Sequence, residues 1–274
     1  MPIEHAMQYM ESNAVEGWLQ ETAAEALCMI ASGADFADRP VCEIGVHHGK
    51  LAIFLALLTG GRLAAFDLFE HQDQNVDRSG RGNKRIFLQN CRKHGLAPEQ
   101  VAAVSLNSLT LKPEDVVAQC GGERPAIFSV DGGHTAELTA NDLKIAAAAV
   151  APDGIVVLDD FFNQLFPEVC WGTMNLLRDQ PDILFPVCIA GGKLIFARSA
   201  EHAAEYRSVL ANRRAVSLTH ISRFEEHRFF ERPVVVMWPR RHPESARQWL
   251  AQTPLWQSVR DTRLGETMRR LTTL

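Results

Sequence analysis

Three carboxylates and one histidine stand directly behind apolar runs of the chain, where they could take part in chemistry. Asp131 follows one such run, His134 comes three residues later, and Asp159 and Asp160 follow the next run. Oxygen ligands without cysteine suit Mg²⁺, which proteins usually hold through one or two carboxylates plus waters. An imidazole with an ordinary pKa can remove a proton from a hydroxyl group at neutral pH. These residues predict a reaction site in which Asp131, Asp159 and Asp160 are the candidate ligands of a metal ion, though not all three need bind it, and His134, with Asp131 beside it, serves in catalysis. Helix caps and solvated strand ends are the alternative.

An earlier segment combines two glycines with an acid. The spacing Glu43-x-Gly45-x-x-x-Gly49 follows an apolar run, and Asp67 ends the next one. Such glycines let the backbone approach a ligand and turn into a helix whose free N–H groups face it. The spacing is neither G-x-G-x-x-G nor a P-loop, so a dinucleotide or triphosphate is disfavoured. An acid beside the glycines suits a cationic ligand such as S-adenosylmethionine, and Asp67 is placed to accept hydrogen bonds from two ribose hydroxyls. A turn with a solvated aspartate is the alternative.

The elements that must position these residues alternate from Pro40 to about Arg198. Short apolar or β-branched runs are separated by longer stretches with helical spacing, which predicts right-handed crossovers and a mostly parallel sheet covered on both faces. Ligands bind such doubly wound sheets at the carboxyl ends of the strands. The predicted strands span residues 41–44, 62–66, 101–105, 126–130 and 154–158, and the predicted helices span 51–58, 84–94, 113–120 and 136–150.

Segments outside this core predict additions to it. Residues 11–31 have an amphipathic helical pattern with a start signal at Ser12-Asn13, and the runs 183–190 and 193–197 flank Gly191-Gly192 as in an antiparallel hairpin. Weaker patterns predict a helix near 201–211, a strand at 234–238 and a helix near 243–251. We therefore expect an α/β, doubly wound, Rossmann-like fold with three parts: an N-terminal helical segment (1–39), a core (40–198) and a C-terminal extension packed on that core (199–274).

Composition limits the partners. The 28 Lys and Arg residues against 33 Asp and Glu give a net charge of −5, which is unfavourable for holding nucleic acid. The apolar runs are shorter than the roughly 18 residues of a membrane span, and the first residues do not resemble a signal peptide, so we expect a cytoplasmic protein. The six cysteines form no C-x-x-C pair, which argues against a zinc site or a disulfide framework. Trp18 is expected to pack in the core, to close the pocket, or to form a subunit contact in a homo-oligomer.

Taken in order, these motifs resemble those of class I S-adenosylmethionine-dependent methyltransferases, particularly small-molecule O-methyltransferases. The resemblance covers about residues 40–198 and includes Asn107-Ser108 after the third predicted strand. It implies transfer of a methyl group to a hydroxyl of a small-molecule acceptor, with Mg²⁺ assistance if the protein is of the divalent-metal kind. One departure is His47, because the commoner family loop has a third glycine at that position.

The resemblance also implies roles for single residues at the cofactor. It places Glu43, Gly45 and Gly49 at the methionine end, Asp67 at the ribose, Ser108 near the adenine, and Asp131 against the cofactor.

Two other functions stay open at this point. An NAD(P)-dependent oxidoreductase or epimerase predicts G-x-G-x-x-G and Tyr-x-x-x-Lys, whereas neither Tyr9 nor Tyr206 has a lysine four residues on. A non-catalytic S-adenosylmethionine-binding protein would keep the cofactor pocket with a diverged reaction site. The polar loop 71–83 is longer than a routine connection, which predicts a lid over the site or a plain flexible connection.

Overall fold

The structure, a computed structural model, describes residues 2–212 and 220–240. They include nearly all of one compact unit that ends at Trp238. The strands are β1 (Val41–Ile44), β2 (Leu63–Asp67), β3 (Val101–Ser105), β4 (Ile127–Val130), β5 (Ile155–Leu158), β6 (Phe185–Ala190), β7 (Lys193–Ala197), β8 (Ile221–Phe229) and β9 (Arg232–Pro239).

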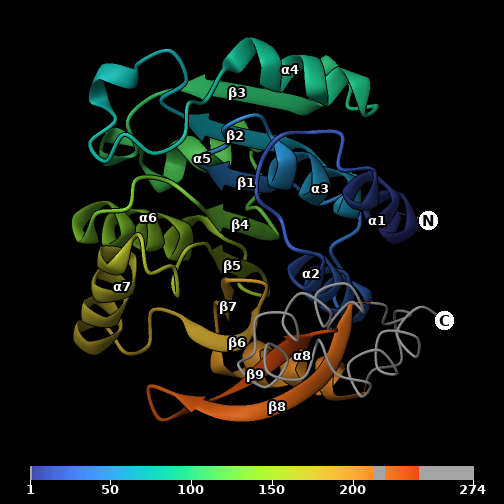
Figure 1. The fold of residues 1–274 in the computed structure, drawn as a ribbon, viewed down its shortest axis with the longest axis vertical. Coiled ribbons are helices and arrows are strands. Elements are labelled where there is room, and N and C mark those ends of the chain that lie inside the picture. Colours follow the sequence, from blue (N-terminus) through green and yellow to red (C-terminus); the bar gives the residue numbers. More distant parts are fainter. Residues whose placement is uncertain (1, 213–219, 241–274) are drawn as a thin grey trace, which may run out of the picture. The chain divides into compact units, whose positions relative to one another are not determined.

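These strands form a single sheet in the order β3-β2-β1-β4-β5-β7-β6-β9-β8, with β3 at the top and β8 at the bottom of Figure 1. Strands β1 to β5 are parallel, in the doubly wound order. Strand β7 enters beside β5 in the antiparallel direction and pairs with β6. The predicted α/β fold, with its mostly parallel sheet and antiparallel hairpin, is therefore confirmed.

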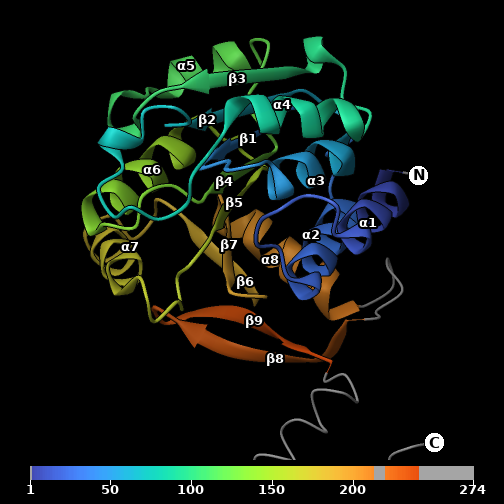
Figure 2. The ribbon, with the colours of Figure 1, turned by 45° about the horizontal axis from the view of Figure 1, so that its top comes forward.

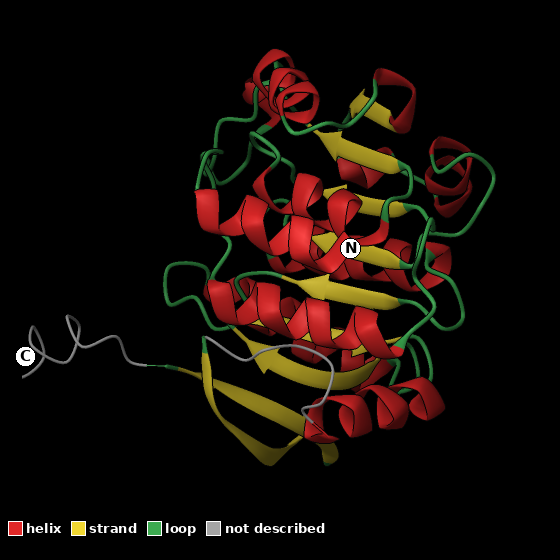
Figure 3. Cartoon of the chain, turned by 90° about the vertical axis from the view of Figure 1, so that its right-hand side faces the viewer, coloured by secondary structure: helices red, strands yellow, loops and turns green. Residues whose placement is uncertain are grey.

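Helices cover both faces of the sheet. They are α1 (Pro2–Ser12), α2 (Glu21–Gly33), α3 (Lys50–Thr59), α4 (Lys84–Lys93), α5 (Pro113–Gln119), α6 (Ala136–Ala149), α7 (Pro167–Asp179) and α8 (Ala200–Asn212), with short 3₁₀ turns η1 (Gln72–Gln74), η2 (Pro98–Gln100) and η3 (Ser108–Thr110). Figure 2 shows α1 to α4 on one side of the sheet and α5 to α7 on the other, and Figure 3 shows helices lying across one face.

Two hydrophobic cores result, one on each face. In β5, Ile155 and Val157 belong to the core beneath α2, α3 and α8, whereas Val156 and Leu158 belong to the core beneath α5, α6 and α7. Because side chains alternate between the two faces and both faces are buried, the strand is apolar throughout. No helix in the described residues is long and apolar enough to cross a membrane.

The predicted core elements agree with the structure to within one or two residues, but the N-terminal prediction is wrong. Two helices, α1 and α2, replace the single helix expected over residues 11–31. The Ser12-Asn13 pair ends a helix instead of starting one, because Asn13 adopts the left-handed conformation (φ +46°) and the Ser12 hydroxyl donates to the Tyr9 carbonyl at 2.6 Å. Helix α7 and strand β8 were not predicted, and the predicted helix near 243–251 lies outside the described residues.

Candidate active site

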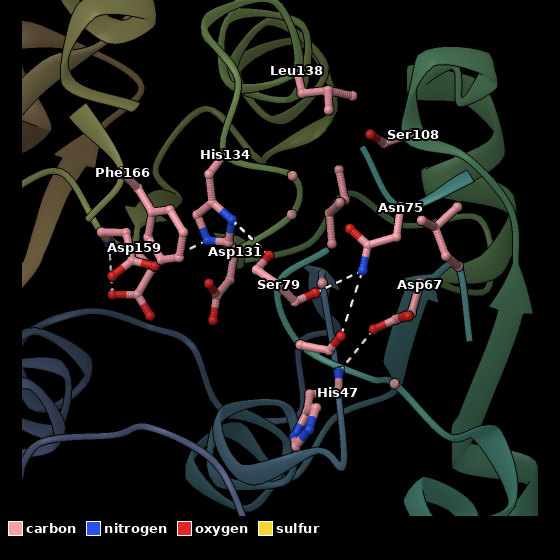
Figure 4. Close-up of a pocket in the computed structure, with 18 of the residues that line it drawn as sticks. His47, Asp67, Asn75, Ser79, Ser108, Asp131, His134, Leu138, Asp159 and Phe166 are labelled. Atoms are coloured by element: carbon pink, nitrogen blue, oxygen red, sulfur yellow. Dashed lines mark hydrogen bonds and ion pairs between the residues drawn. The ribbon is translucent and has the colours of Figure 1, made fainter. Parts of the chain in front are cut away.

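A cavity of about 650 Å³ opens at the carboxyl ends of the parallel strands. In Figure 4, Asp67, Asn75 and Ser108 lie toward one end, and Asp131, His134, Asp159 and Phe166 lie toward the other. Parallel strands bring residues from distant parts of the chain to one edge of the sheet, which explains why these side chains share a single hollow.

Asp67, the last residue of β2, holds the loop that follows β1. Its Oδ2 accepts hydrogen bonds from the backbone N–H groups of Val46 and His47, both at 2.8 Å, and its Oδ1 accepts one from Phe69 at 2.7 Å. A carboxylate offers about four acceptor positions. One position therefore remains for a ligand hydroxyl, so a ribose bound through both hydroxyls would have to replace a backbone donor.

The glycines of this loop differ in what they do. Gly45 has φ +84°, and a Cβ there would lie 1.7 Å from the Asp131 carbonyl oxygen, so only glycine lets the ends of β1 and β4 approach. Gly49 is the N-cap of α3, packs against the Phe87 ring, and is not among the residues that line the cavity. Glu43 also lies behind the cavity wall, and its burial raises its pKa to about 8 despite the opposing charge of Lys193.

His47 is the residue at which the loop departs from the family pattern that the sequence resembles. Its φ of +52° lies in the left-handed region that glycine adopts without strain. The ring stacks on His48 at 3.9 Å between centroids and lies 5.7 Å from the Trp18 ring, which lines the cavity. Glu16, His47 and His48 bring three potential metal-ligand atoms together, but Glu16 already contacts His48 at 3.2 Å.

His134 is held at both ring nitrogens. Its Nδ1 lies 2.8 Å from Asp77 Oδ2 and 2.9 Å from Ser79 Oγ, and its Nε2 lies 3.1 Å from Asp160 Oδ2. The ring stacks on Phe166 at 3.8 Å. Burial alone would lower the pKa of His134, but the hydrogen bonds to Asp160 and Asp77 raise it above its ordinary value.

A buried lysine lies beside the acids. Lys193, at the start of β7, contacts Asp159 Oδ2 with its Nζ, because the antiparallel register that pairs Leu194 with Leu158 places the two residues side by side. The lysine side chain is 2% exposed. Burial lowers the pKa of Lys193, but Asp159 and then Asp131 outweigh this effect and raise it. Sequence reasoning did not assign Lys193, since no local pattern marks a residue that its strand pairing alone brings to the site.

The three aspartates predicted to bind Mg²⁺ have different surroundings. Asp131 points into the cavity without a hydrogen bond from the described part of the chain, and burial, followed by the charge of Asp159, raises its pKa. Asp159 is paired with Lys193. Asp160 is paired with His134, and potential ligand atoms of Asp131, His134 and Asp160 lie within 4.8 Å of one another. Asp159 is not part of that group of potential ligand atoms.

The far end of the cavity is formed by η3 and the polar loop 71–83. Ser108 lines the cavity, and its carbonyl accepts a hydrogen bond from Asn141 Nδ2 at 3.1 Å. The loop lines the cavity with Asn75, Ser79 and Gly82 among other residues, which supports its prediction as a cover over the site.

The family comparison agrees with this geometry. A family model described as "Methyltransferase domain" matches residues 42–161, which begin in β1 and end just beyond the Asp159-Asp160 pair. This part of the chain is a methyltransferase domain. This match bears out the predicted class, because the matched part of the chain is similar to methyltransferases. A search of curated proteins found no significant match to this chain.

Several solved structures are similar to this chain at low identity. The O-methyltransferase NovP is 17% identical, with a TM-score of 0.48 over 72% of this chain and 79% of that chain. A TDP-rhamnose 3′-O-methyltransferase of calicheamicin biosynthesis is 16% identical, with a TM-score of 0.48 over 72% and 92%. The O-methyltransferase from Bacillus cereus, in complex with SAH, is 15% identical, with a TM-score of 0.44 over 71% and 89%.

Proposed function

We propose that this methyltransferase transfers the methyl group of S-adenosylmethionine to a hydroxyl group of a small-molecule acceptor. One observation carries the proposal: the imidazole of His134 lies beside Asp131 and Asp160 in the same cavity that Asp67 and Ser108 line at its other end. A hydroxyl is a weak nucleophile until its proton is removed, and histidine is the side chain best suited to remove it near neutral pH.

The residues that line the cavity fit S-adenosylmethionine, and each would contact a different part of it. S-adenosylmethionine, when bound, supplies a methyl group activated by its sulfonium centre. The free acceptor position of Asp67 would hold a ribose hydroxyl, and Ser108 would lie near the adenine. Asp131 would face the cationic sulfonium centre, since its side chain lines the cavity and accepts no hydrogen bond from the described residues.

The proton path uses His134. The acceptor hydroxyl would approach His134 Nε2 in place of Asp160 Oδ2, and its proton would pass to that nitrogen as the oxygen attacks the methyl carbon. Asp77, which stays at Nδ1, and the nearby charge of Asp160 would then stabilise the imidazolium that forms.

We further propose that the reaction proceeds without a divalent metal. An Mg²⁺ ion held by Asp159 would have to separate that carboxylate from Lys193, a buried ion pair whose disruption is costly, and an ion held by Asp131 and Asp160 would compete with the contact between Asp160 and His134. The ammonium group already places a positive charge beside these acids. The expected result is that enzyme treated with EDTA keeps its methyl-transfer rate, and that added MgCl₂ raises the rate by less than about twofold. Loss of activity that MgCl₂ restores would contradict this proposal.

The cofactor assignment is tested by calorimetric titration with S-adenosylhomocysteine. Asp67→Asn keeps the size of the side chain but removes its charge, so we expect the dissociation constant to rise at least about tenfold, since hydrogen bonds to charged groups contribute roughly 1.5–3 kcal/mol. Glu70→Gln, an exposed change three residues further on, is the matched control. Binding of NAD instead of S-adenosylhomocysteine, or an unchanged constant for Asp67→Asn, would contradict the assignment.

The nature of the acceptor atom is tested with matched acceptor pairs. S-adenosylhomocysteine release is measured with phenols or sugars and with the corresponding amines. We expect turnover with the hydroxyl member of a pair, and turnover with only the amine member would overturn the proposed hydroxyl specificity.

A further inference from the structure

The polar loop 71–83 is organised by its own side chains into a shape that presents Asp77 to the site. Asn75 Nδ2 donates to the Ser79 carbonyl at 2.7 Å, and Asn75 Oδ1 accepts from the Arg78 backbone at 3.1 Å. Arg78 adopts the left-handed conformation, with φ +59°. This compact turn points the Asp77 carboxylate toward the segment that follows β4.

The Asp77 carboxylate has no acceptor position to spare. Its Oδ1 accepts from the backbone N–H and the hydroxyl of Ser79, at 2.9 and 2.6 Å. Its Oδ2 lies 2.6 Å from the backbone nitrogen of His134, which donates to it, and 2.8 Å from Nδ1 of the same residue. These four contacts match the roughly four acceptor positions of a carboxylate. Burial would raise the pKa of Asp77, but these hydrogen bonds lower it to about 2, so the group is charged.

This arrangement fixes the orientation of His134. Among the described residues, Nδ1 has hydrogen-bond contacts only with Asp77 and Ser79, and both belong to the loop. An Nδ1–H that donates to Asp77 turns Nε2 toward Asp160 and the cavity. Phe166 packs on one face of the ring but has no polar group that could select a tautomer.

We propose that Asp77 is the positioning residue for His134, so that the reaction centre is complete only when the loop 71–83 is docked. The assignment of His134 as the reacting base rests on the function proposed above, whereas the docking contact itself does not. The same loop passes over the cofactor end, because Gly82 approaches Asp67 so closely that a Cβ would lie 2.4 Å from Asp67 Oδ1. One loop conformation therefore covers the residue assigned to the ribose and orients the base.

The first test is kinetic. Asp77→Asn keeps the shape of the side chain but replaces an acceptor oxygen by an NH₂ group that cannot accept from Ser79 or His134. We expect kcat to fall about 10- to 100-fold, as expected when a reacting group is misplaced, with less than a threefold change in the KM of the acceptor. Asp73→Asn removes the same charge from an exposed position of the same loop that does not line the cavity, and it should keep the wild-type kcat.

The second test measures docking without reference to activity. Arg78 and Arg81 are exposed trypsin sites within the loop. Cleavage there should become at least about fivefold faster in Asp77→Asn and also in His134→Gln, because each removes one side of the contact, and it should stay unchanged in Asp73→Asn. Ser79→Ala, which removes one of the four donors, should give an intermediate rate.

The outcomes separate the two proposals. A wild-type kcat for Asp77→Asn, or cleavage rates equal to those of Asp73→Asn, overturns the positioning role. If Asp77→Asn and His134→Gln both speed cleavage but the protein does not bind S-adenosylhomocysteine, the docking contact stands and the proposed function fails. A fall in kcat accompanied by an equal rise in the KM of the acceptor assigns Asp77 to substrate binding and also overturns the proposal.

Discussion

Replacing His134 with glutamine is expected to lower kcat by about 10²-fold or more, because loss of a general base usually has an effect of this size. Glutamine retains a polar side chain of similar reach but cannot take up the hydroxyl proton. The measurement is steady-state release of S-adenosylhomocysteine with a saturating acceptor. The affinity for S-adenosylhomocysteine should change little, which separates loss of chemistry from loss of the pocket. A kcat within about threefold of the wild type would remove His134 from the reaction.

The pH dependence of the wild-type enzyme provides a second check on the same residue. Only the neutral imidazole can accept a proton, and the contacts with Asp160 and Asp77 raise the pKa of His134 above its ordinary 6.5. The rate should therefore rise with pH through a pKa above 6.5. Asp160→Asn removes the first of these contacts, so its rising limb should move to lower pH, and His134→Gln should lack the limb. An acidic limb that stays in place in Asp160→Asn would contradict this assignment.

The core of the fold could be predicted because both faces of its sheet are buried. Such strands are short continuous apolar runs. Strand β5 fits that description, and β4 fits it except for Ser129, with four buried residues in each strand. Strand β8 could not be found this way. It contains Arg223, Glu225, Glu226 and Arg228, and most of its residues are not buried, since it forms one edge of the sheet. It lies beside β9 across the two-residue turn Phe230-Glu231, and no apolar run marks it.

The candidate site was predictable to the extent that it follows strand ends. Asp67, Asp131 and Asp160 each stand just after or at the end of a strand, and parallel strands place their ends at one edge. The groups that pair with the residues of this site come from parts of the chain that do not directly follow the parallel strands. Lys193 reaches Asp159 across 34 positions through an antiparallel pairing, and Asp77 reaches His134 across 57 positions through a loop turn. Neither contact can be predicted from the spacing of residues in the sequence. The predicted metal site therefore included Asp159 but not Lys193, the cation that is paired with it.

Replacing Lys193 with methionine is expected to lower the free energy of unfolding by about 3–5 kcal/mol, the usual effect of removing one partner of a buried ion pair. Methionine fills a similar volume, so the loss arises mainly from the charge. Asp159, 14% exposed in the pair, would be left without its cation beside two further acids, Asp131 and Glu43, whose pKa values burial has already raised. The measurement is urea unfolding at pH 7. The dependence of the unfolding free energy on urea concentration is compared between variants, because a change in stability alone should leave it unchanged.

Two further variants show whether the buried charge is the cause. Adding Asp159→Asn to Lys193→Met removes the anion that the lysine neutralised, so the double variant should recover part of the lost stability. Asp153→Asn breaks the more exposed pair with Arg39, in which the side chains are 23% and 37% exposed, and should cost no more than about 1 kcal/mol. If Lys193→Met is no more destabilising than Asp153→Asn, Lys193 does not neutralise these acids, and the argument that it replaces a divalent cation fails with it.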